Sequence, residues 1–420
     1  MDKDGSYSNL LLDEALGRSQ LSAQDKRFVS ALFYGTLERR YTLDRILDQR
    51  LKSGRSKLTA DTVNILRSGL YQIMYMDSVP DNAAVNESVK LAKRDKNPSI
   101  SGLVNAVLRG FIRDGKPLPE TSGHSDGLAV KYSCPVWLVE KWISEYGDAA
   151  AETMLASSLG QAPVTVRANT LRQPLESIIR LLREDGFTAE ISPVVPDCLM
   201  IGGAGIESSR AYSQGLVHVQ DISCQLCCAA LGALPGETVL DICSAPGGKT
   251  FTVAEMMNNE GEVLAFDLHG NRARLIERGA QRLGLSIVKA SANDGRKYSE
   301  TMPLADRVLC DVPCSGLGVI RRKPEIKYKS PEEFERLPEI QYSILDTSSR
   351  YVKSGGTLVY STCTLSRAEN DGVSQRFLSE HPEFAKGKLP GQFGDGFDVT
   401  ITPDRFGSDG FYIAVFRRER

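Results

Sequence analysis

One stretch of sequence indicates the fold, Asp241-Ile242-Cys243-Ser244-Ala245-Pro246-Gly247-Gly248-Lys249-Thr250, which joins a short apolar run to a helical pattern. Small residues in such a turn let a ligand approach the backbone at the start of a helix. From about residue 221 onward, short apolar runs alternate with helical patterns, and this alternation builds an open parallel sheet covered on both faces. The expected strands are 238–243, 262–267, 286–290, 306–311, 356–361 and 412–417.

The turn matches neither familiar phosphate-binding pattern. A P-loop ending in Gly248-Lys249-Thr250 needs glycine where Cys243 stands, and the G-x-G-x-x-G fingerprint is absent. The second expected strand ends in Asp267, whose carboxylate can accept both ribose hydroxyls of an adenosine. Asp294 follows the third strand and could accept from the adenine amino group, although an Asp there is commonly a turn residue. A ligand with adenosine but no pyrophosphate, such as S-adenosylmethionine, fits these features.

Two cysteines follow neighbouring expected strands. Cys314 comes after the fourth strand and Cys363 after the fifth, so both lie where the methyl group of that cofactor would arrive. Pyrimidine chemistry needs thiols here, because C5 of cytosine becomes nucleophilic only after a thiolate adds to C6. A second group must then assist release of the enzyme. A lone cysteine is more often an inert core residue, and we interpret three others in this way: Cys198, Cys243 and Cys310.

The rest of the chain predicts two further domains, since 420 residues correspond to two to four domains. Residues 1–116 show helical periodicity and carry 19 Lys and Arg against 14 Asp and Glu, whereas the whole chain has a net charge of -2. Segment 114–127 has linker composition, and 128–220 alternates helical stretches at 137–145 and 176–184 with a strand at 164–167. We expect an all-α bundle (1–116), a small α+β domain (128–220) and an α/β Rossmann-like domain (221–420).

Cysteine usage and hydropathy limit the compartment and the metal content. The nine cysteines lack the density of a disulfide scaffold, which favours a reducing cytoplasm. The start of the chain is acidic and no apolar run of membrane-spanning length occurs, so we expect neither export nor a membrane span. Cys224, Cys227 and Cys228 have no second C-x-x-C pair to complete a zinc site, and we expect no metal.

Taken together, the motifs resemble those of the RNA cytosine-5 methyltransferases, in particular the bacterial members that act on 16S rRNA. The resemblance rests on the turn at 241–250, on Asp311-Val312-Pro313-Cys314-Ser315-Gly316, and on Ser361-Thr362-Cys363-Thr364-Leu365 with Glu369-Asn370. Residues 25–37, 79–93 and 103–109 resemble that family's NusB-like helical RNA-binding domain.

The resemblance implies a role for each matching residue. Cys363 is the nucleophile that attacks C6, and Cys314 assists elimination. The cofactor is S-adenosylmethionine, and the partner is 16S rRNA in a protein-free or early assembly form, with neither DNA nor membrane involved. The residues that match the family's cofactor site are Cys243, Ser244, Ala245, Pro246, Gly247, Gly248, Lys249, Asp267, Asp294 and Asp311.

Two other functions remain open at this point, a tRNA cytosine-5 methyltransferase and a catalytically silent RNA-binding scaffold. The helical domain argues against the first, and retention of both cysteines argues against the second. DNA cytosine-5 methyltransferases place the nucleophile in a Pro-Cys motif followed by Glu-Asn-Val, which is absent here, and Cys363 favours RNA. The basic run 321–329 follows the Cys314 loop, so we expect it to contact RNA phosphates, with Tyr328 available for stacking.

Overall fold

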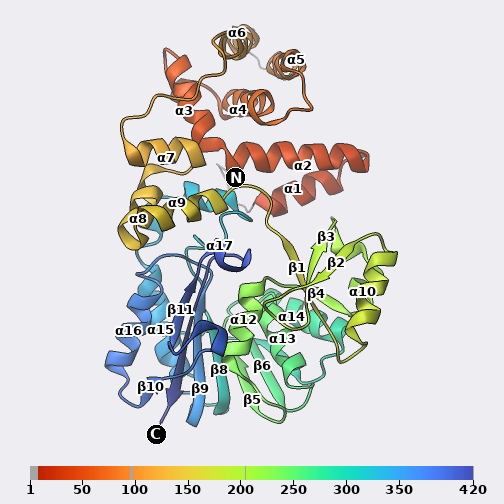
Figure 1. The fold of residues 1–420 in the computed structure, drawn as a ribbon, viewed down its shortest axis with the longest axis vertical. Coiled ribbons are helices and arrows are strands. Elements are labelled where there is room, and N and C mark those ends of the chain that lie inside the picture. The colour runs from red at the N-terminus through yellow and green to blue at the C-terminus, as the bar shows by residue number, and fades with distance from the viewer. Residues whose placement is uncertain (1–7, 95–96, 98, 204, 420) are drawn as a thin grey trace. The chain divides into compact units, whose positions relative to one another are not determined.

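The computed structural model describes residues 8–94, 97, 99–203 and 205–419 (Figure 1). The chain forms two compact units. The first, called the helical unit here, comprises Met1–Gly160 and Ile320–Lys329. The second, called the sheet unit, comprises Gln161–Val319 and Ser330–Arg420. The helical unit therefore includes a short segment, Ile320–Lys329, that lies far from the rest of the unit in the sequence.

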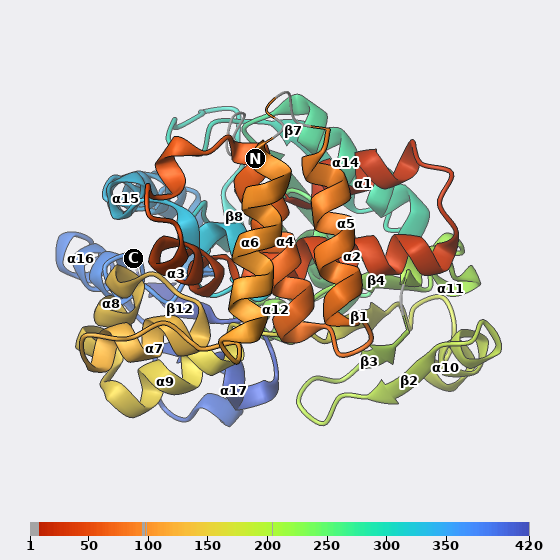
Figure 2. The same cartoon turned by 90° about the horizontal axis from the view of Figure 1, so that it is seen from above.

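The helical unit is built from amphipathic helices, and the predicted all-α bundle is confirmed. Helices α4, α5 and α6 pack side by side (Figure 2). The predicted apolar positions are buried, including Leu43, Leu47, Leu66 and Leu70, each 0% exposed. The helices are α1 (Ser8–Gly17), α2 (Ala23–Glu38), α3 (Arg40–Arg50), α4 (Ala60–Tyr75), α5 (Asp81–Ala92), α6 (Ser99–Arg113), α7 (His124–Tyr132), α8 (Val136–Tyr146) and α9 (Asp148–Ser157), with short 3-10 turns at Arg55–Lys57 and Pro324–Tyr328.

The sheet unit begins with a small α+β domain, as predicted. Its four-stranded antiparallel sheet has the order β2-β3-β1-β4 and is covered by α10. Apolar side chains of α10 such as Ile178 and Leu182 are fully buried against this sheet, because they recur at helical spacing. The elements are β1 (Val164–Ala168), α10 (Leu175–Glu184), β2 (Thr188–Ile191), β3 (Cys198–Gly202), α11 (Arg210–Ser213) and β4 (Val217–Val219).

The remainder of the sheet unit is the predicted Rossmann-like domain. Its large sheet has the order β10-β12-β9-β8-β5-β6-β7, with β11 paired to β12. The strands are β5 (Thr238–Asp241), β6 (Glu262–Asp267), β7 (Val288–Ala292), β8 (Ala305–Asp311), β9 (Val352–Thr362), β10 (Phe384–Lys386), β11 (Asp398–Ile401) and β12 (Phe411–Arg418). The helices are α12 (Ile222–Leu231), α13 (Gly248–Met256), α14 (Gly270–Leu283), α15 (Leu337–Ser349), α16 (Asp371–Glu380) and α17 (Pro403–Phe406).

The sheet is mixed, whereas the sequence predicted a parallel one. Strands β7, β6, β5, β8 and β9 are parallel, but β12 runs antiparallel to β9. After α16 the chain makes the extra strands β10 and β11, so it enters β12 from the carboxyl edge of the parallel strands. A pattern of alternating apolar residues carries no strand direction, and this detail was therefore wrong.

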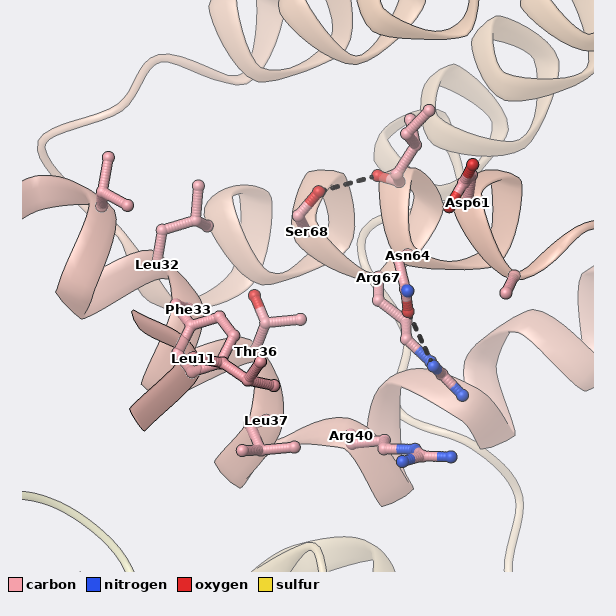
Figure 3. A pocket seen from close by; sticks show the side chains of 13 residues that line it. Leu11, Leu32, Phe33, Thr36, Leu37, Arg40, Asp61, Asn64, Arg67 and Ser68 are labelled. Carbon is pink, nitrogen blue, oxygen red and sulfur yellow. Dashed lines mark hydrogen bonds between the residues drawn. The ribbon is translucent and has the colours of Figure 1, made fainter. Parts of the chain in front are cut away.

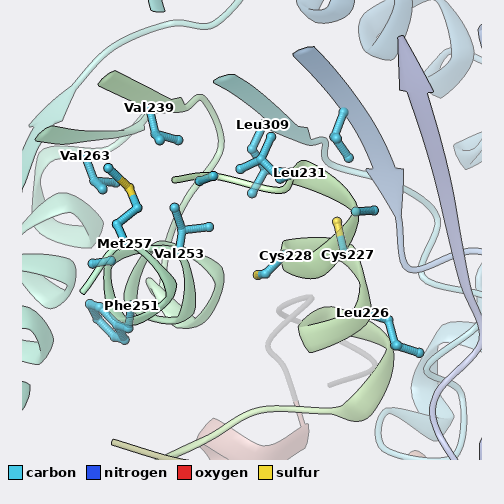
Figure 4. Packing of buried hydrophobic residues seen from close by; sticks show 14 of the residues in the cluster. Leu226, Cys227, Cys228, Leu231, Val239, Phe251, Val253, Met257, Val263 and Leu309 are labelled. Carbon is cyan, nitrogen blue, oxygen red and sulfur yellow. The ribbon is translucent and has the colours of Figure 1, made fainter. Parts of the chain in front are cut away.

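Both faces of the large sheet are covered by helices, as predicted. One hydrophobic core joins the sheet to α12 and α13, where Leu231, Phe251 and Met257 pack against Val239 and Val263 (Figure 4). A second core lies on the other face and includes residues of α15 and α16. No helix among the described residues is long and apolar enough to cross a membrane.

Candidate active site

The loops that follow β8 and β9 bring together the two cysteines singled out in the sequence. Asp311 and Ser361 are register partners at the ends of these parallel strands, so the loops start side by side. The sulfur atoms of Cys314 and Cys363 lie 3.2 Å apart, and both side chains are partly exposed. The structure therefore places two thiols in direct contact at the carboxyl edge of the sheet.

Hydrogen bonds between main-chain groups hold the two cysteine loops close together. The Gly318 N–H donates to the Cys363 carbonyl at 3.0 Å, and the Gly410 N–H donates to the Gly318 carbonyl at 2.9 Å. A Cβ at position 318 would lie 2.1 Å from the Gly410 carbonyl oxygen, so only glycine fits there. The main chain after Cys314 is thus fixed to the main chain of Cys363.

The Cys314 thiol gives up its proton less readily than an ordinary cysteine. Its hydrogen bond to Cys363 raises the pKa of Cys314 well above the usual value, and burial and the charges of Cys363 and Glu369 act in the same direction. A thiol that shares a proton with a neighbouring sulfur stabilises negative charge on that neighbour. Cys314 is therefore suited to donate a hydrogen bond to the sulfur of Cys363.

An ion pair lies next to this thiol pair on the sheet edge. Lys249 Nζ is 2.6 Å from Asp311 Oδ2, and the Ser361 hydroxyl donates to Asp311 Oδ1 at 2.9 Å. Burial is the largest single effect and lowers the pKa of Lys249, but the charge of Asp311, the neighbouring thiols and the hydrogen bond to Asp311 together outweigh it and raise the pKa well above its usual value. Lys249 is thus a firmly charged partner of Asp311.

The turn between β5 and α13 has the tight conformation that its small residues predict. Gly247 has a φ of 111°, a region that other residues rarely adopt, and the Ala245-Pro246 peptide bond is cis. The Ser244 hydroxyl donates to the Phe266 carbonyl at 2.8 Å and ties the turn to β6. The turn residues 243–249 therefore form a compact edge at the start of α13.

The two other carboxylates of the predicted cofactor site follow β6 and β7. Asp267 is 4% exposed, accepts from the His269 N–H at 3.1 Å, and pairs with Arg272 at 3.1 Å. Asp294 pairs with Arg296 at 3.0 Å. The Asn293 N–H donates to the Asp267 carbonyl at 2.9 Å, which brings these two loops to the same edge as the turn.

The arrangement of acids at this edge fits the cofactor that the sequence suggested. Asp267, Asp294 and Asp311 are carboxylates that accept from hydroxyl and amino groups and attract a positive charge. The nearby cation Lys249 is already paired with Asp311. These acceptors suit an adenosine that carries a sulfonium.

The cysteines interpreted as core residues differ from the active pair. Cys198 and Cys310 are 0% exposed, and burial raises the pKa of Cys198 to about 11 and that of Cys310 to about 12. Cys243 remains partly exposed in the turn, and its pKa is also raised well above the usual value by burial. The fully buried thiols of Cys198 and Cys310 are in surroundings that make a cysteine inert.

The basic run after the Cys314 loop lies inside the helical unit, which corrects the prediction that Tyr328 is available for stacking. Lys327 is 0% exposed and donates to the Glu38 carbonyl at 2.8 Å, and the Tyr328 hydroxyl donates to the same oxygen at 3.2 Å. The ring of Tyr328 lies under the Arg40 guanidinium. The contacts are long-range, so charge and composition gave no sign of them.

A pocket of about 710 Å³ lies between α2 and α4 in the helical unit (Figure 3). Its walls combine apolar side chains of α2 with polar side chains of α4. Arg67 donates to Asn64 at 2.9 Å and to Asp44 at 2.6 and 2.8 Å, so its guanidinium is held within the helical unit. The labelled lining residues are Leu11, Leu32, Phe33, Thr36, Leu37, Arg40, Asp61, Asn64, Arg67 and Ser68.

Glu369 belongs to the Glu369-Asn370 motif of the sequence, but no role was predicted for it. The structure buries this carboxylate, 2% exposed, beneath both cysteine loops. It accepts from the Ser315 N–H at 2.9 Å and from Gln341 Nε2 at 2.8 Å. The spacing of six residues after Cys363 was visible in the sequence, but the partner Gln341 lies on α15 and gave no local signal.

Three family models match successive parts of the chain. They are the NusB family (residues 1–113), the RsmF/B-like ferredoxin-like domain (134–205) and the 16S rRNA methyltransferase RsmB/F (228–417). Together they account for the bundle, the small α+β domain and the Rossmann-like domain described above.

Similarity to known proteins extends over the whole chain. A probable ribosomal RNA small subunit methyltransferase B of Bacillus subtilis is 38% identical over 100% of this chain and 96% of the relative. The ribosomal RNA small subunit methyltransferase B of Thermus thermophilus is 33% identical over 99% of this chain and 94% of the relative. The crystal structure of PH0851 superposes with a TM-score of 0.83 at 28% identity and covers 96% of this chain and 93% of its own. With both the fold and the full-length similarity in agreement, this chain belongs to the ribosomal RNA small subunit methyltransferase B family.

Proposed function

We propose that this protein transfers a methyl group from S-adenosylmethionine to C5 of a cytosine in 16S rRNA, through a covalent bond between Cys363 and C6. The observation that carries the proposal is the pair of thiols 3.2 Å apart at the carboxyl edge of the sheet. Methyl transfer to the oxygen or exocyclic nitrogen of a base needs no such pair, whereas transfer to C5 needs one nucleophile and one release group.

The cofactor would bind along the same edge. Asp267 is proposed to accept from the ribose hydroxyls and Asp294 from the adenine, with Arg272 and Arg296 moving aside or sharing the carboxylates. Residues 243–249 would line the amino-acid end, and Asp311 would face the sulfonium. S-adenosylmethionine supplies an electrophilic methyl group when bound. The protein then has to orient the base and control its protons.

In the proposed reaction Cys363 adds to C6 as a thiolate, and the electron pair of the C5–C6 double bond becomes available at C5. That pair takes the methyl group, so C5 carries both a methyl group and a hydrogen. On release, the departing Cys363 sulfur takes the proton of Cys314, and the resulting Cys314 thiolate takes the C5 proton while the double bond re-forms. Both thiols end protonated, and Cys363 loses its proton to solvent before the next cycle.

The helical unit is proposed to bind the RNA. Its NusB-like fold and the excess of basic residues in 1–116 support this role. The target base must leave its stack to reach Cys363, so single-stranded or locally opened RNA is the expected form. We further propose the functional division 1–116 for RNA binding, 128–220 for the small domain and 221–420 for catalysis.

The test combines the protein, methyl-labelled S-adenosylmethionine and protein-free 16S rRNA, and compares Cys363→Ser and Cys314→Ser with the unaltered chain. We expect labelled 5-methylcytosine from the unaltered chain, no label from Cys363→Ser, and a trapped protein–RNA adduct from Cys314→Ser. Cys134→Ala, which alters a buried cysteine of the helical unit, is the matched control and should keep full activity.

Two results would replace the proposal by its alternatives. Label in tRNA but not in 16S rRNA would retain the chemistry and change the substrate. RNA binding without any methyl transfer would support the other alternative, a catalytically silent RNA-binding scaffold.

A further inference from the structure

The buried carboxylate of Glu369 lies between the two cysteine loops. Its three short hydrogen bonds come from neutral donors: the Ser315 N–H at 2.9 Å, the Ser315 hydroxyl at 2.6 Å and Gln341 Nε2 at 2.8 Å. An ionised carboxylate with 2% exposure is tolerated only when such bonds replace its water shell. These three donors therefore allow the carboxylate to lie buried close to the thiols.

The hydrogen bonds of Glu369 reach the residues next to both cysteines. Ser315 follows Cys314, and Thr364 follows Cys363. The Ser315 and Thr364 hydroxyl oxygens lie 2.6 Å apart, and Thr364 Oγ1 is 3.5 Å from Glu369 Oε1. One carboxylate thus fixes the separation of two loops that come from different strands.

A third element completes the arrangement around this carboxylate. Gln341 of α15 donates both to Glu369 and to the Pro313 carbonyl at 3.0 Å, so it contacts the main chain just before Cys314. The Tyr360 hydroxyl of β9 donates to the Glu369 carbonyl. Ser315, which follows Cys314, is therefore hydrogen-bonded to Glu369. Pro313, which precedes Cys314, is hydrogen-bonded to Gln341, a direct partner of Glu369.

The charge of Glu369 also acts on the thiol itself. It adds to the hydrogen bond and charge of Cys363 and to burial in raising the pKa of Cys314. The pKa of Tyr360 is also raised well above the usual value, mainly by burial and further by the charges of Cys314 and Glu369. A carboxylate at this place favours the protonated form of the release thiol.

We propose that Glu369 is a positioning residue for the release step, which holds Cys314 as a neutral thiol against Cys363. The inference rests on the proposed function. It predicts that Glu369 affects elimination of the enzyme from the methylated base more strongly than methyl transfer. A merely structural role predicts equal losses in both steps, because both need the same folded loops.

The experiment measures both steps in single turnover for Glu369→Gln, with the exposed Glu339→Gln as the matched control. Glutamine keeps the shape and removes the charge, although one of the donors then lacks an acceptor. We expect the transfer rate to stay within about threefold and release to slow by about tenfold to a hundredfold, as for loss of a general acid or of its placement. Protein–RNA adduct should accumulate, and Glu339→Gln should behave like the unaltered chain.

A thiol titration separates positioning from folding. In the Cys363→Ser background, the pH dependence of Cys314 alkylation should move to lower pH when Glu369→Gln is added. Ser315→Ala removes the hydroxyl contacts with Glu369 and Thr364 and keeps the carboxylate, so it should slow release less than Glu369→Gln and serves as the measured variant if Glu369→Gln does not fold.

The outcomes distinguish this inference from the proposed function. Equal slowing of transfer and release, or release at the normal rate in both variants, would overturn the role of Glu369. If the unaltered chain forms no covalent adduct with RNA at all, the proposed function itself fails.

Discussion

Cys314 and Cys363 place their sulfur atoms 3.2 Å apart although 49 residues separate them along the chain. The contact exists because β8 and β9 are parallel neighbours, so their carboxyl ends meet at one edge. The two sulfur atoms are therefore close enough to exchange a proton.

The short contact predicts sensitivity to oxidation. Hydrogen peroxide should convert the two thiols to a disulfide, with loss of two hydrogens from the protein and formation of two waters from the peroxide. Methyl transfer should cease and return after treatment with dithiothreitol. Peptide mapping should find the 314–363 link, and Cys314→Ser should not form it. Unchanged activity with both thiols still alkylatable would contradict the prediction.

Stability should depend on pH through Asp241. Burial raises the pKa of Asp241 from 3.8 to about 7, against the hydrogen bond from Thr250 that lowers it. The folded protein therefore holds this proton more tightly than the unfolded chain does, and the contribution of Asp241 to stability falls as pH rises from about 4 to about 7.

Asp241→Asn should remove this dependence. Between pH 5 and pH 8 the unaltered chain should lose more stability than the variant, by an amount on the order of a few kcal/mol. Denaturant midpoints at the two pH values measure the difference. The exposed Asp404→Asn should follow the unaltered chain, and parallel profiles for all three proteins would refute the assignment to Asp241.

Lys249→Met should destabilise the protein because it leaves Asp311 without its cation. The side chains are 11% and 27% exposed, so the cost should be about 1–3 kcal/mol, below that of a fully buried pair. The more exposed pair of Lys353 and Asp306 provides the control, and Lys353→Met should cost under about 1 kcal/mol. Equal costs in urea unfolding would argue against a special role of the Lys249 pair.

Lys327→Met should weaken the helical unit without weakening its electrostatic attraction to RNA. The ammonium group is buried and bound to the Glu38 carbonyl, so its removal should cost about 1–3 kcal/mol of stability. The slope of RNA affinity against salt concentration should stay constant, because a buried cation meets no phosphate. A reduced slope with unchanged thermal stability would show that Lys327 contacts RNA.

Local sequence patterns were sufficient to predict several of the helices and strands. The strand expected at 262–267 is β6 with the same bounds, and the helix expected at 176–184 lies within α10. Both follow from spacing, since apolar residues recur with the period of the element that buries them. The positions of Cys314 and Cys363 after consecutive strands also followed, because parallel strands end at a common edge.

Contacts between distant segments were decided only by the tertiary structure. The antiparallel direction of β12, the bonds from Lys327 and Tyr328 to the Glu38 carbonyl, and the bond from Gln341 to Glu369 each join residues that are remote in sequence. Local periodicity records which face of an element is apolar but not which distant backbone or carboxylate that face meets. The hydrogen bonds of Glu369 to Ser315 and Gln341 therefore become visible only once β8, β9 and α15 are packed together.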